Sequence, residues 1–386
     1  MKIKHIVSLL LVLVMIFSLF SCNDEPADAD VVTDKSTAEE SSEKPNEMVR
    51  KSYNIIENLE NIKTYGRPTI SSAGLSCDLV ASGIEFKAYV EGRVVLTLSS
   101  SDETYFTLWI DGERSETRFV SYGTTNQVFE LGDFKEGGVH TFRFLKQTEP
   151  QYSTVDMKSV SFTGYFKEKP VDSSMYIEFI GASMFCGYGN LVMNGASKPG
   201  MPPSSDGTQS YAYLTAEKLS ADHSVISVSG IGVVASSKKP AFKDVYSVNS
   251  YYRSQTDKYV PTRTPDVIIS GLGTNDINNK VSLEDWKAGL TELITYIRTI
   301  YGKNIPVVWT YNMMVNESIP SSIENRDKYM NAAREAFDAL GGEEAGLYLL
   351  KVTANREGGG SHPSLEAHKQ QSNDVVNFLI QKKLIK

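Results

Sequence analysis

The hydrophobic period of the chain changes near Pro170, and this change constrains the fold more than any other feature. From Arg67 to Phe166, apolar and polar residues alternate in short runs, such as "SGIEFKA" and "TYFTLWIDGE", the second of which ends in an Asp-Gly turn signal. Alternation with a period of two is typical of half-buried antiparallel strands. We therefore predict an N-terminal all-β domain, a jelly roll or β-sandwich, over residues 65–168.

After Pro170, short apolar runs alternate with stretches of helical period. The runs that indicate buried strands are Tyr176–Ile180, Val225–Val228, Val267–Ser270, Ile305–Trp309 and Leu347–Val352. The helical stretches are Gln209–Asp222, Ser282–Ile300, Arg326–Leu340 and a last helix from the Pro363–Ser364 pair to Gln381. Because strands that alternate with helices form parallel sheets, residues 169–386 are predicted to be a flavodoxin-like α/β domain.

The first residues have the features of an export signal. Lys2 and Lys4 precede an apolar run that ends at Phe20, which predicts a signal peptide over residues 1–21. The sequence Leu-Phe-Ser-Cys at its end resembles a bacterial lipoprotein box, which implies cleavage before Cys22 and a lipid on that cysteine. An ordinary secretory signal is the alternative. We expect a lipid-anchored protein of the bacterial cell envelope, at the outer membrane and exposed on the surface.

The segment after Cys22 carries too little apolar surface to form a core. Residues 23–47 are acidic and rich in Ser, Thr and Pro, so we predict a disordered tether over residues 22–64. Within it, only Tyr53–Ile62 is apolar enough to pack against the first domain, as a short helix or strand. The net charge of −8 argues against a nucleic acid or an anionic membrane as partner, since both require a basic face. Membrane attachment is expected only through the lipid.

Polar clusters follow the predicted strands of the second domain. Ser183 follows the first strand, Gly230 the second, Asn275 the third and His362 the fifth. The carboxyl ends of parallel strands meet at one edge of the sheet, so these residues are expected to lie together. Acyl transfer requires a hydroxyl nucleophile, a neutral imidazole as base and preorganised donors for the oxyanion. No histidines have metal-ligand spacing, so no metal and no cofactor are expected.

The segments "IEFIGASMFCGYGN", "VSGIG", "GLGTND" and "SHPSLEAH" resemble the four blocks of the SGNH (GDSL) hydrolases, in particular carbohydrate esterase family 2. Members of that family join a jelly roll to an SGNH domain and remove acetyl groups from polysaccharides and sugars. The resemblance implies that Ser183 is the nucleophile and His362 the base. It also implies an oxyanion hole formed by the N–H groups of Ser183 and Gly230 and the Asn275 amide. A monomer acting on acetylated polysaccharide or oligosaccharide is expected.

Two positions depart from the family pattern. Ala182 replaces the usual aspartate before the serine, and Gly359 stands where many relatives have an aspartate that supports the histidine. Three other supports for His362 are open: a main-chain carbonyl of the glycine run 358–360, which we favour, the carboxylate of Glu357 and, more remotely, that of Asp276. Asp276 is expected to stabilise the loop of Asn275.

Four further residues are candidate substrate contacts, with ordinary packing as the alternative for each: Tyr188, Asn190, Trp309 and Asn312. Two other functions stay open at this point. One is a lipid or thioester hydrolase of the same fold, and the other is a glycan-binding protein with a weak or inactive esterase site. The polar, Gly/Pro-rich segment "LVMNGASKPGMPPSSDG" suits a loop facing sugar better than an acyl groove.

Overall fold

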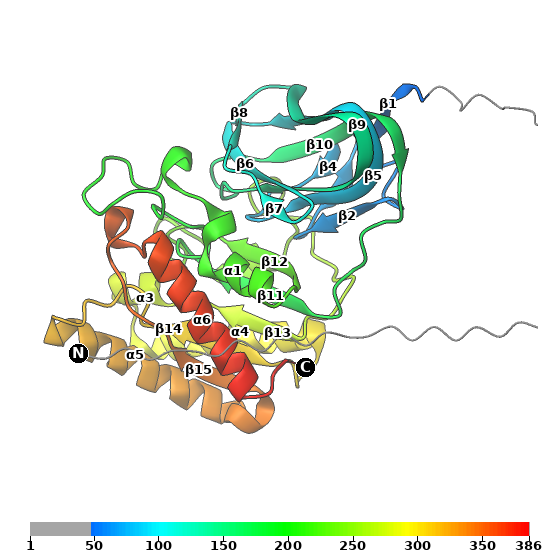
Figure 1. Ribbon diagram of the computed structural model, residues 1–386. Coiled ribbons are helices and arrows are strands. Elements are labelled where there is room, and N and C mark those ends of the chain that lie inside the picture. Colours follow the sequence, from blue (N-terminus) through cyan, green and yellow to red (C-terminus); the bar gives the residue numbers. More distant parts are fainter. Residues whose placement is uncertain (1–47, 386) are drawn as a thin grey trace, which may run out of the picture. The chain divides into compact units, whose positions relative to one another are not determined.

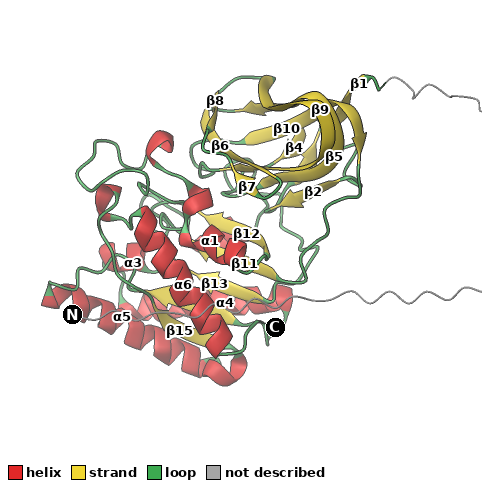
Figure 2. Ribbon diagram, in the orientation of Figure 1, coloured by secondary structure: helices red, strands yellow, loops and turns green. Residues whose placement is uncertain are grey.

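The structure, a computed structural model, describes residues 48–385 (Figures 1 and 2). The predicted signal peptide, Cys22 and the first part of the predicted tether lie outside the described residues. Within the described part of the chain, none of the helices combines the length and apolarity that a bilayer span requires.

The first domain is an antiparallel β-domain, as predicted. Its strands are β1 (Arg50–Asn54), β2 (Ile62–Tyr65), β3 (Thr69–Ser71), β4 (Gly74–Ser76), β5 (Gly83–Ser100), β6 (Glu103–Ile110), β7 (Glu113–Arg114), β8 (Phe119–Tyr122), β9 (Gln127–Lys146) and β10 (Val155–Phe166). The main path of the sheet is β3-β4-β10-β5-β9-β6-β7. Figure 2 shows these strands, in yellow, curled around one core. The Asp-Gly turn joins β6 to β7, with Ile110 opposite Glu113.

The alternation in β5 explains how the β-domain forms. Phe86 and its neighbours two residues away are buried, whereas the residues between them point outward. Phe86 stacks on Phe142 of β9 with ring centroids 5.0 Å apart, and both belong to the same apolar core. The long strands therefore close around a core rich in phenylalanine.

The β-domain begins earlier than the predicted boundary at residue 65. Strand β1 pairs with β10, with Arg50 opposite Thr163, and strand β2 pairs with β5. Ile55 and Ile62 are fully buried in the β-domain core. The predicted tether is therefore wrong for residues 50–64, because their few apolar side chains supply part of this core.

The second domain is the predicted parallel α/β domain. Its strands are β11 (Tyr176–Gly181), β12 (Asp222–Ser227), β13 (Val267–Ser270), β14 (Val307–Tyr311) and β15 (Leu347–Lys351), in the order β12-β11-β13-β14-β15. The helices are α1 (Tyr211–Lys218), α2 (Phe242–Tyr246), α3 (Thr274–Asn278), α4 (Leu283–Tyr301), α5 (Pro320–Ala339) and α6 (Leu365–Gln381). Short 3₁₀ turns lie at Pro202–Ser204, Gly207–Gln209, Gly342–Ala345 and Gly359–Ser361.

Helices cover both faces of this sheet, so its strands, apart from the edge strand β12, are mostly apolar. Ile180 of β11 packs in the cluster that includes α4 and α5, whereas Phe179 packs in the cluster that includes α1 and α6. Figure 1 shows α6, in red, running beside α1. The Ser282 hydroxyl caps α4 by accepting from the N–H of Asp285.

The β-domain covers the edge strand β12. Val80 forms an isolated antiparallel bridge with Val225 of β12. Next to it, the carbonyl of Ala81 lies 3.0 Å from Nε2 of His223, and the N–H of Gly66 donates to the His223 carbonyl at 3.2 Å. An uncovered edge strand would offer unpaired backbone groups to other chains, so this contact protects the sheet.

A buried ion pair also joins the two domains, between Arg67 of the β-domain and Glu178 of β11, the strand next to β12. Arg67 Nη2 lies 3.0 Å from the Glu178 carboxylate in the middle of β11, and both side chains are at most 1% exposed. The hydroxyls of Tyr246 and Tyr301 also donate to this carboxylate. The Arg67 guanidinium packs over the ring of Tyr259, 3.6 Å from its centroid. These contacts explain how a glutamate can occupy a fully buried strand.

We expect Arg67→Met to lower the free energy of unfolding by about 3–5 kcal/mol, because it leaves the Glu178 carboxylate buried without its ion partner. Arg93→Met is the matched control, since Arg93 pairs with Glu130 at 3.6 Å on the surface. That control is expected to cost about 1 kcal/mol or less. Urea unfolding of the three proteins measures the difference. Equal, small losses would show that the buried pair contributes no more than the exposed one.

Candidate active site

The loops after β11, β12 and β13 leave the sheet at neighbouring points. Gly181 at the end of β11 lies opposite Ser227 of β12, and Ile180 lies opposite Ser270 of β13. The sheet therefore presents the loops of Ser183, Gly230 and Asn275 along one edge, as the sequence predicts.

Ser183 and His362 meet at this edge, although 179 residues separate them in the chain. Ser183 Oγ lies 2.8 Å from Nε2 of His362, and the other ring nitrogen, Nδ1, lies 3.1 Å from the carbonyl oxygen of Gly360. The carbonyl can only accept, so Nδ1 carries the proton and Nε2 is free to accept from the serine hydroxyl. Burial lowers the pKa of His362 to about 4, so the imidazole is neutral at pH 7.

Tyr188 lies against the histidine. Its ring stacks on that of His362 with centroids 4.3 Å apart and an interplanar angle of 29°. Gly200 lies on the tyrosine ring, where a Cβ atom would come within 1.9 Å of a ring carbon. Tyr188 was predicted to contact substrate, and that contact stays a prediction. What the structure shows is a ring that limits the movement of the imidazole.

Glycines allow the serine loop and the histidine loop to touch. The Gly359 N–H donates to the carbonyl of Gly189 at 2.9 Å, and a Cβ on Gly189 would lie 2.6 Å from the Gly359 oxygen. A Cβ on Gly359 would lie 2.6 Å from Pro199 and 2.7 Å from Val192. An aspartate therefore has no room at position 359 while these loops are packed as they are.

Glu357 is engaged away from the histidine. Its carboxylate accepts from the side-chain amide of Asn355 at 3.0 Å and from the Ser364 hydroxyl at 3.5 Å. Asn355 Oδ1 in turn accepts from the N–H groups of Glu357 and Ser364. Among the supports that the sequence leaves open for His362, the geometry favours the main-chain carbonyl. Asn355 organises this loop, and no sequence pattern singled it out.

The predicted oxyanion donors have free N–H groups. Within residues 48–385, the backbone N–H of neither Ser183 nor Gly230 donates a hydrogen bond. Gly230 has φ +82°, a conformation that favours glycine. The Asn275 amide donates one N–H to the carbonyl of Ile231 at 2.8 Å, which leaves its second N–H available and joins its loop to that of Gly230.

Asp276 stabilises the same pair of loops, as predicted. Its two carboxylate oxygens accept from the N–H groups of Val233 and Val234, each at 3.0 Å. Gly232 allows this approach, since a Cβ there would lie 2.7 Å from the carboxylate. Burial raises the pKa of Asp276 to about 6, and the backbone donors oppose that rise. Asp276 is therefore a structural partner of the Asn275 loop.

Of the predicted substrate contacts, Trp309 is wrong because it is fully buried, whereas Asn190 and Asn312 are hydrogen-bonded within the protein and their contact with substrate stays a prediction. Trp309 is fully buried in the core of the α/β domain, and its indole N–H donates to the Leu272 carbonyl at 3.0 Å. Asn190 uses its amide on the backbone N–H and carbonyl of Asp206, both at 2.9 Å. Asn312 is 5% exposed, and its amide is held by Arg326 and the Val352 carbonyl. All three side chains are used in packing or loop structure.

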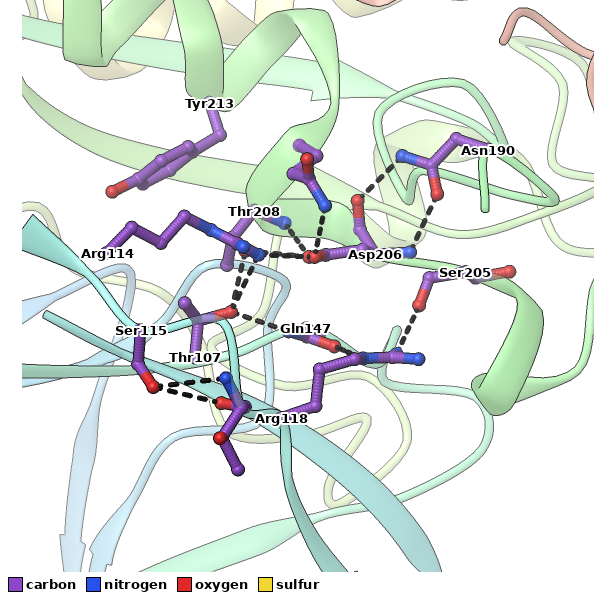
Figure 3. A network of polar contacts seen from close by, with 12 residues as sticks. Thr107, Arg114, Ser115, Arg118, Gln147, Asn190, Ser205, Asp206, Thr208 and Tyr213 are labelled. Carbon is purple, nitrogen blue, oxygen red and sulfur yellow. Dashed lines mark hydrogen bonds and ion pairs between the residues drawn. The ribbon is translucent and has the colours of Figure 1, made fainter. Parts of the chain in front are cut away.

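The β-domain holds the loop that follows the serine turn. Figure 3 shows Arg114 and Arg118 of the β-domain directed at Asp206 and Ser205. Arg114 Nη2 lies 2.7 Å from the buried Asp206 carboxylate, and Arg118 donates to the carbonyl of Ser205 at 2.8 Å and to the Gln147 side chain at 2.7 Å. The sequence did not indicate these contacts, because their partners lie in separate predicted domains.

A cavity of about 170 Å³ adjoins the third loop. The lining includes Gly273 and Thr274, which precede Asn275, together with Tyr311, Met313, Met314 and Arg356. The lining mixes these apolar groups with polar side chains such as Asn312 and Arg326, which suits a small polar ligand. Within residues 48–385, no cluster of three His, Cys, Asp or Glu side chains could hold a metal ion.

Curated proteins similar to this chain include several esterases. Cellulase/esterase CelE from Acetivibrio thermocellus is 31% identical over 214 residues, which cover 53% of this chain and 25% of that protein. An acetylxylan esterase / glucomannan deacetylase from Cellvibrio japonicus is 24% identical over 242 residues, or 61% of each protein. This chain thus spans a quarter of the first relative and less than two thirds of the second. A second Cellvibrio japonicus protein of the same description is 25% identical over 315 residues, 78% of this chain and 84% of that protein.

Solved structures with the same fold cover both domains. A family two carbohydrate esterase from Clostridium thermocellum, in complex with cellohexaose, matches with a TM-score of 0.77 and 22% identity, over 84% of this chain and 100% of that one. A family two carbohydrate esterase from Cellvibrio japonicus matches with a TM-score of 0.76 and 18% identity, over 88% and 99%. At these identities the likeness shows a common fold.

The comparison with protein families agrees with the geometry of the site. Residues 179–370 match the sequence model of the GDSL-like Lipase/Acylhydrolase family, and this range begins inside β11 and ends inside α6. It contains Ser183, Gly230, Asn275 and His362. Residues 179–370 are therefore a GDSL-like (SGNH) hydrolase domain.

Proposed function

We propose that this chain is a serine esterase that removes O-acetyl groups from polysaccharides or sugars. The observation that carries the proposal is the 2.8 Å contact between Ser183 Oγ and Nε2 of His362, at a sheet edge with unpaired backbone donors. The curated relatives described as acetylxylan esterase / glucomannan deacetylase support acetylated plant polysaccharide as the substrate class.

The reaction begins with attack of Ser183 Oγ on the acetyl carbonyl carbon, while Nε2 of His362 takes the hydroxyl proton. The carbonyl oxygen becomes an oxyanion, which accepts from the N–H groups of Ser183 and Gly230 and the free N–H of Asn275. Collapse of this intermediate breaks the ester bond, and His362 returns the proton to the departing sugar hydroxyl. Water then attacks the acetyl-serine with His362 again as base, which releases acetate and restores Ser183.

A main-chain carbonyl replaces the usual carboxylate in this scheme. The Gly360 oxygen holds the Nδ1 proton and so fixes the tautomer that leaves Nε2 as the acceptor. A neutral carbonyl stabilises the imidazolium less than a carboxylate would. Transition-state stabilisation therefore depends more strongly on the three oxyanion donors.

The cavity beside Asn275 is a suitable place for a sugar ring. Tyr311 and Met314 offer apolar surface for its C–H face, and Thr274 and Arg356 offer donors for its hydroxyls. The segment from Leu191 to Gly207, which the β-domain arginines hold, is rich in Gly, Pro and polar residues, a composition that suits a loop facing sugar better than an acyl groove. These features favour a short acyl group on a carbohydrate over a lipid substrate.

We also propose that the chain is exported and anchored by lipid at Cys22, with the folded domains outside the membrane of a bacterial cell envelope. The charged start, the apolar run and the Leu-x-Ser-Cys sequence support this location. Asp24 and Glu25 resemble an acidic surface-export signal and support exposure at the outer membrane. A monomer is the expected state.

Ser183→Ala is expected to remove esterase activity, by on the order of 10⁴-fold or more, while the fold is kept. Release of acetate from acetylated xylan and glucomannan by wild type and variant tests this, with Ser101→Ala at an exposed β-domain serine as the control. Near wild-type release by Ser183→Ala would refute the assigned nucleophile. Turnover that rises from acetyl to long acyl esters would instead indicate a lipid hydrolase.

Glu357→Gln is expected to keep most of the turnover, because the Glu357 carboxylate contacts Asn355 and Ser364 and not the imidazole. His362→Ala is expected to lose nearly all of it, since no other base contacts Ser183 Oγ among the described residues. Steady-state kinetics of both variants, with circular dichroism as a check of folding, measure this. A loss of about a hundredfold in a folded Glu357→Gln protein would make the carboxylate a third catalytic group.

Cys22→Ser is expected to release the protein from the membrane fraction without changing the activity of the purified enzyme, because the lipid attaches to the cysteine sulfur. Fractionation of cells that produce wild type or variant, followed by acetate-release assays, tests the proposal. Membrane association that persists in the variant would mean that another segment anchors the chain.

A further inference from the structure

We infer that Glu149, a residue of the β-domain, positions the oxyanion loop of the hydrolase domain; this inference rests on the proposed function. Glu149 is 4% exposed, and its carboxylate accepts two hydrogen bonds from a single residue of the other domain. The backbone N–H of Ser229 donates to Oε2 at 2.7 Å, and the Ser229 hydroxyl donates to Oε1 at 2.7 Å. Ser229 directly precedes Gly230.

The backbone around Glu149 is fixed on both sides. Glu149 follows β9, and the main chain just before it is bonded to both domains: the Gln147 N–H donates to the Tyr105 carbonyl at 2.8 Å, and the Gln147 carbonyl accepts from Gly207 at 3.1 Å. After it, the Tyr152 N–H donates to the Glu149 carbonyl. Figure 3 shows the Gln147 side chain meeting Arg118 in the same region. The carboxylate is therefore presented from a rigid support.

The surroundings favour a charged acceptor at this point. The ammonium group of Lys146 is fully buried near Glu149, where it donates to the carbonyls of Thr148 and Asp78. The thiol of Cys186 lies 3.5 Å from Glu149 Oε2, and burial together with this carboxylate raises the pKa of the thiol. Cys186 belongs to the turn of the nucleophile, since its N–H donates to the Ala182 carbonyl. Glu149 thus contacts the serine turn as well as the Gly230 loop.

The two hydrogen bonds between Ser229 and Glu149 restrict the direction in which the Gly230 N–H points. An oxyanion donor is effective only if it already points at the place where the charge develops. The peptide that carries this N–H is formed by Ser229 and Gly230, and Ser229 is held at its own N–H and at its hydroxyl. Gly230 has no side chain and a positive φ, and the turn that contains this peptide is closed by the Ile231 N–H, which donates to the Val228 carbonyl at 3.3 Å. Glu149 adds a second restraint on the same peptide from the other domain.

Glu149→Gln tests the inference. The two donors of Ser229 require two acceptor oxygens, whereas a glutamine amide offers only one oxygen and places an NH₂ group at the other position. We expect kcat to fall about 10- to 100-fold with little change in KM, since a displaced donor weakens the transition state more than substrate binding. Ser229→Ala removes one of the two bonds and is expected to lower kcat less. The rate at which an aryl phosphonate inactivates Ser183 should fall in parallel, because its phosphoryl oxygen occupies the oxyanion hole.

Lys63→Met is the matched control for a purely structural effect between the domains. Lys63 of β2 pairs with Asp222 at 2.6 Å at the opposite end of β12, and Asp222 keeps Arg263 at 2.8 Å when the lysine is removed. This variant is expected to lower the melting temperature without changing kcat.

The outcomes separate this inference from the proposed function. If wild type shows no turnover that depends on Ser183, the proposed function fails and the role of Glu149 fails with it. If wild type is active but Glu149→Gln keeps its kcat and loses only thermal stability, as Lys63→Met does, the positioning role alone is refuted. Should Glu149→Gln not fold, Ser229→Ala decides: lower kcat and slower phosphonate inactivation at unchanged KM support the inference, and wild-type values refute it.

Discussion

The buried ion pair between Arg67 and Glu178 is the interaction on which the arrangement of the two domains depends. Glu178 lies in the central part of β11, the strand that delivers Ser183, and every residue of that strand is buried. A carboxylate at such a position is stable only with a cation and further donors, and the cation comes from the β-domain. Separation of the domains would leave this charge without its partner and uncover the edge of β12. The β-domain is therefore needed for the sheet that carries the nucleophile.

A second buried carboxylate acts at the other end of the same interface. Glu178 belongs to the α/β domain and receives its cation from the β-domain, whereas Glu149 belongs to the β-domain and receives its donors from Ser229. The two contacts lie at different levels along the parallel strands. The Arg67–Glu178 pair lies at the middle of β11, and the Glu149–Ser229 contact lies at the edge where the loops leave the sheet. Together with the Arg114–Asp206 pair, they join the domains by charges that have to be paired. The β-domain thus supports the site itself, whether or not it also binds sugar.

The order of the elements and the main site residues could be predicted because they follow from local patterns. Alternation in β5 and the strand–helix alternation after Pro170 gave both fold classes, and parallel strands bring Ser183 and His362 to one edge whatever the loops do. Side-chain direction and long-range partners could not be predicted. Trp309 faces the helices α4 and α5 as a core residue, and Asn190 finds its partner at Asp206, beyond a loop whose path no local pattern specifies. The contact of Glu149 with Ser229 could not be predicted for the same reason, since these donors lie in the other domain.

The glycine at position 359 is best understood from the packing of the loops. Gly359 touches Gly189, Pro199 and Val192 so closely that the histidine loop can approach the serine loop only without a side chain there. The same approach places the carbonyl of Gly360 beside Nδ1 of His362 and lets the ring of Tyr188 stack on the imidazole. The lack of an aspartate is therefore compatible with a working base, because tautomer and orientation are fixed by other groups. What the carbonyl cannot supply is charge, so under the proposed mechanism the N–H groups of Ser183, Gly230 and Asn275 carry more of the stabilisation, and their direction matters accordingly.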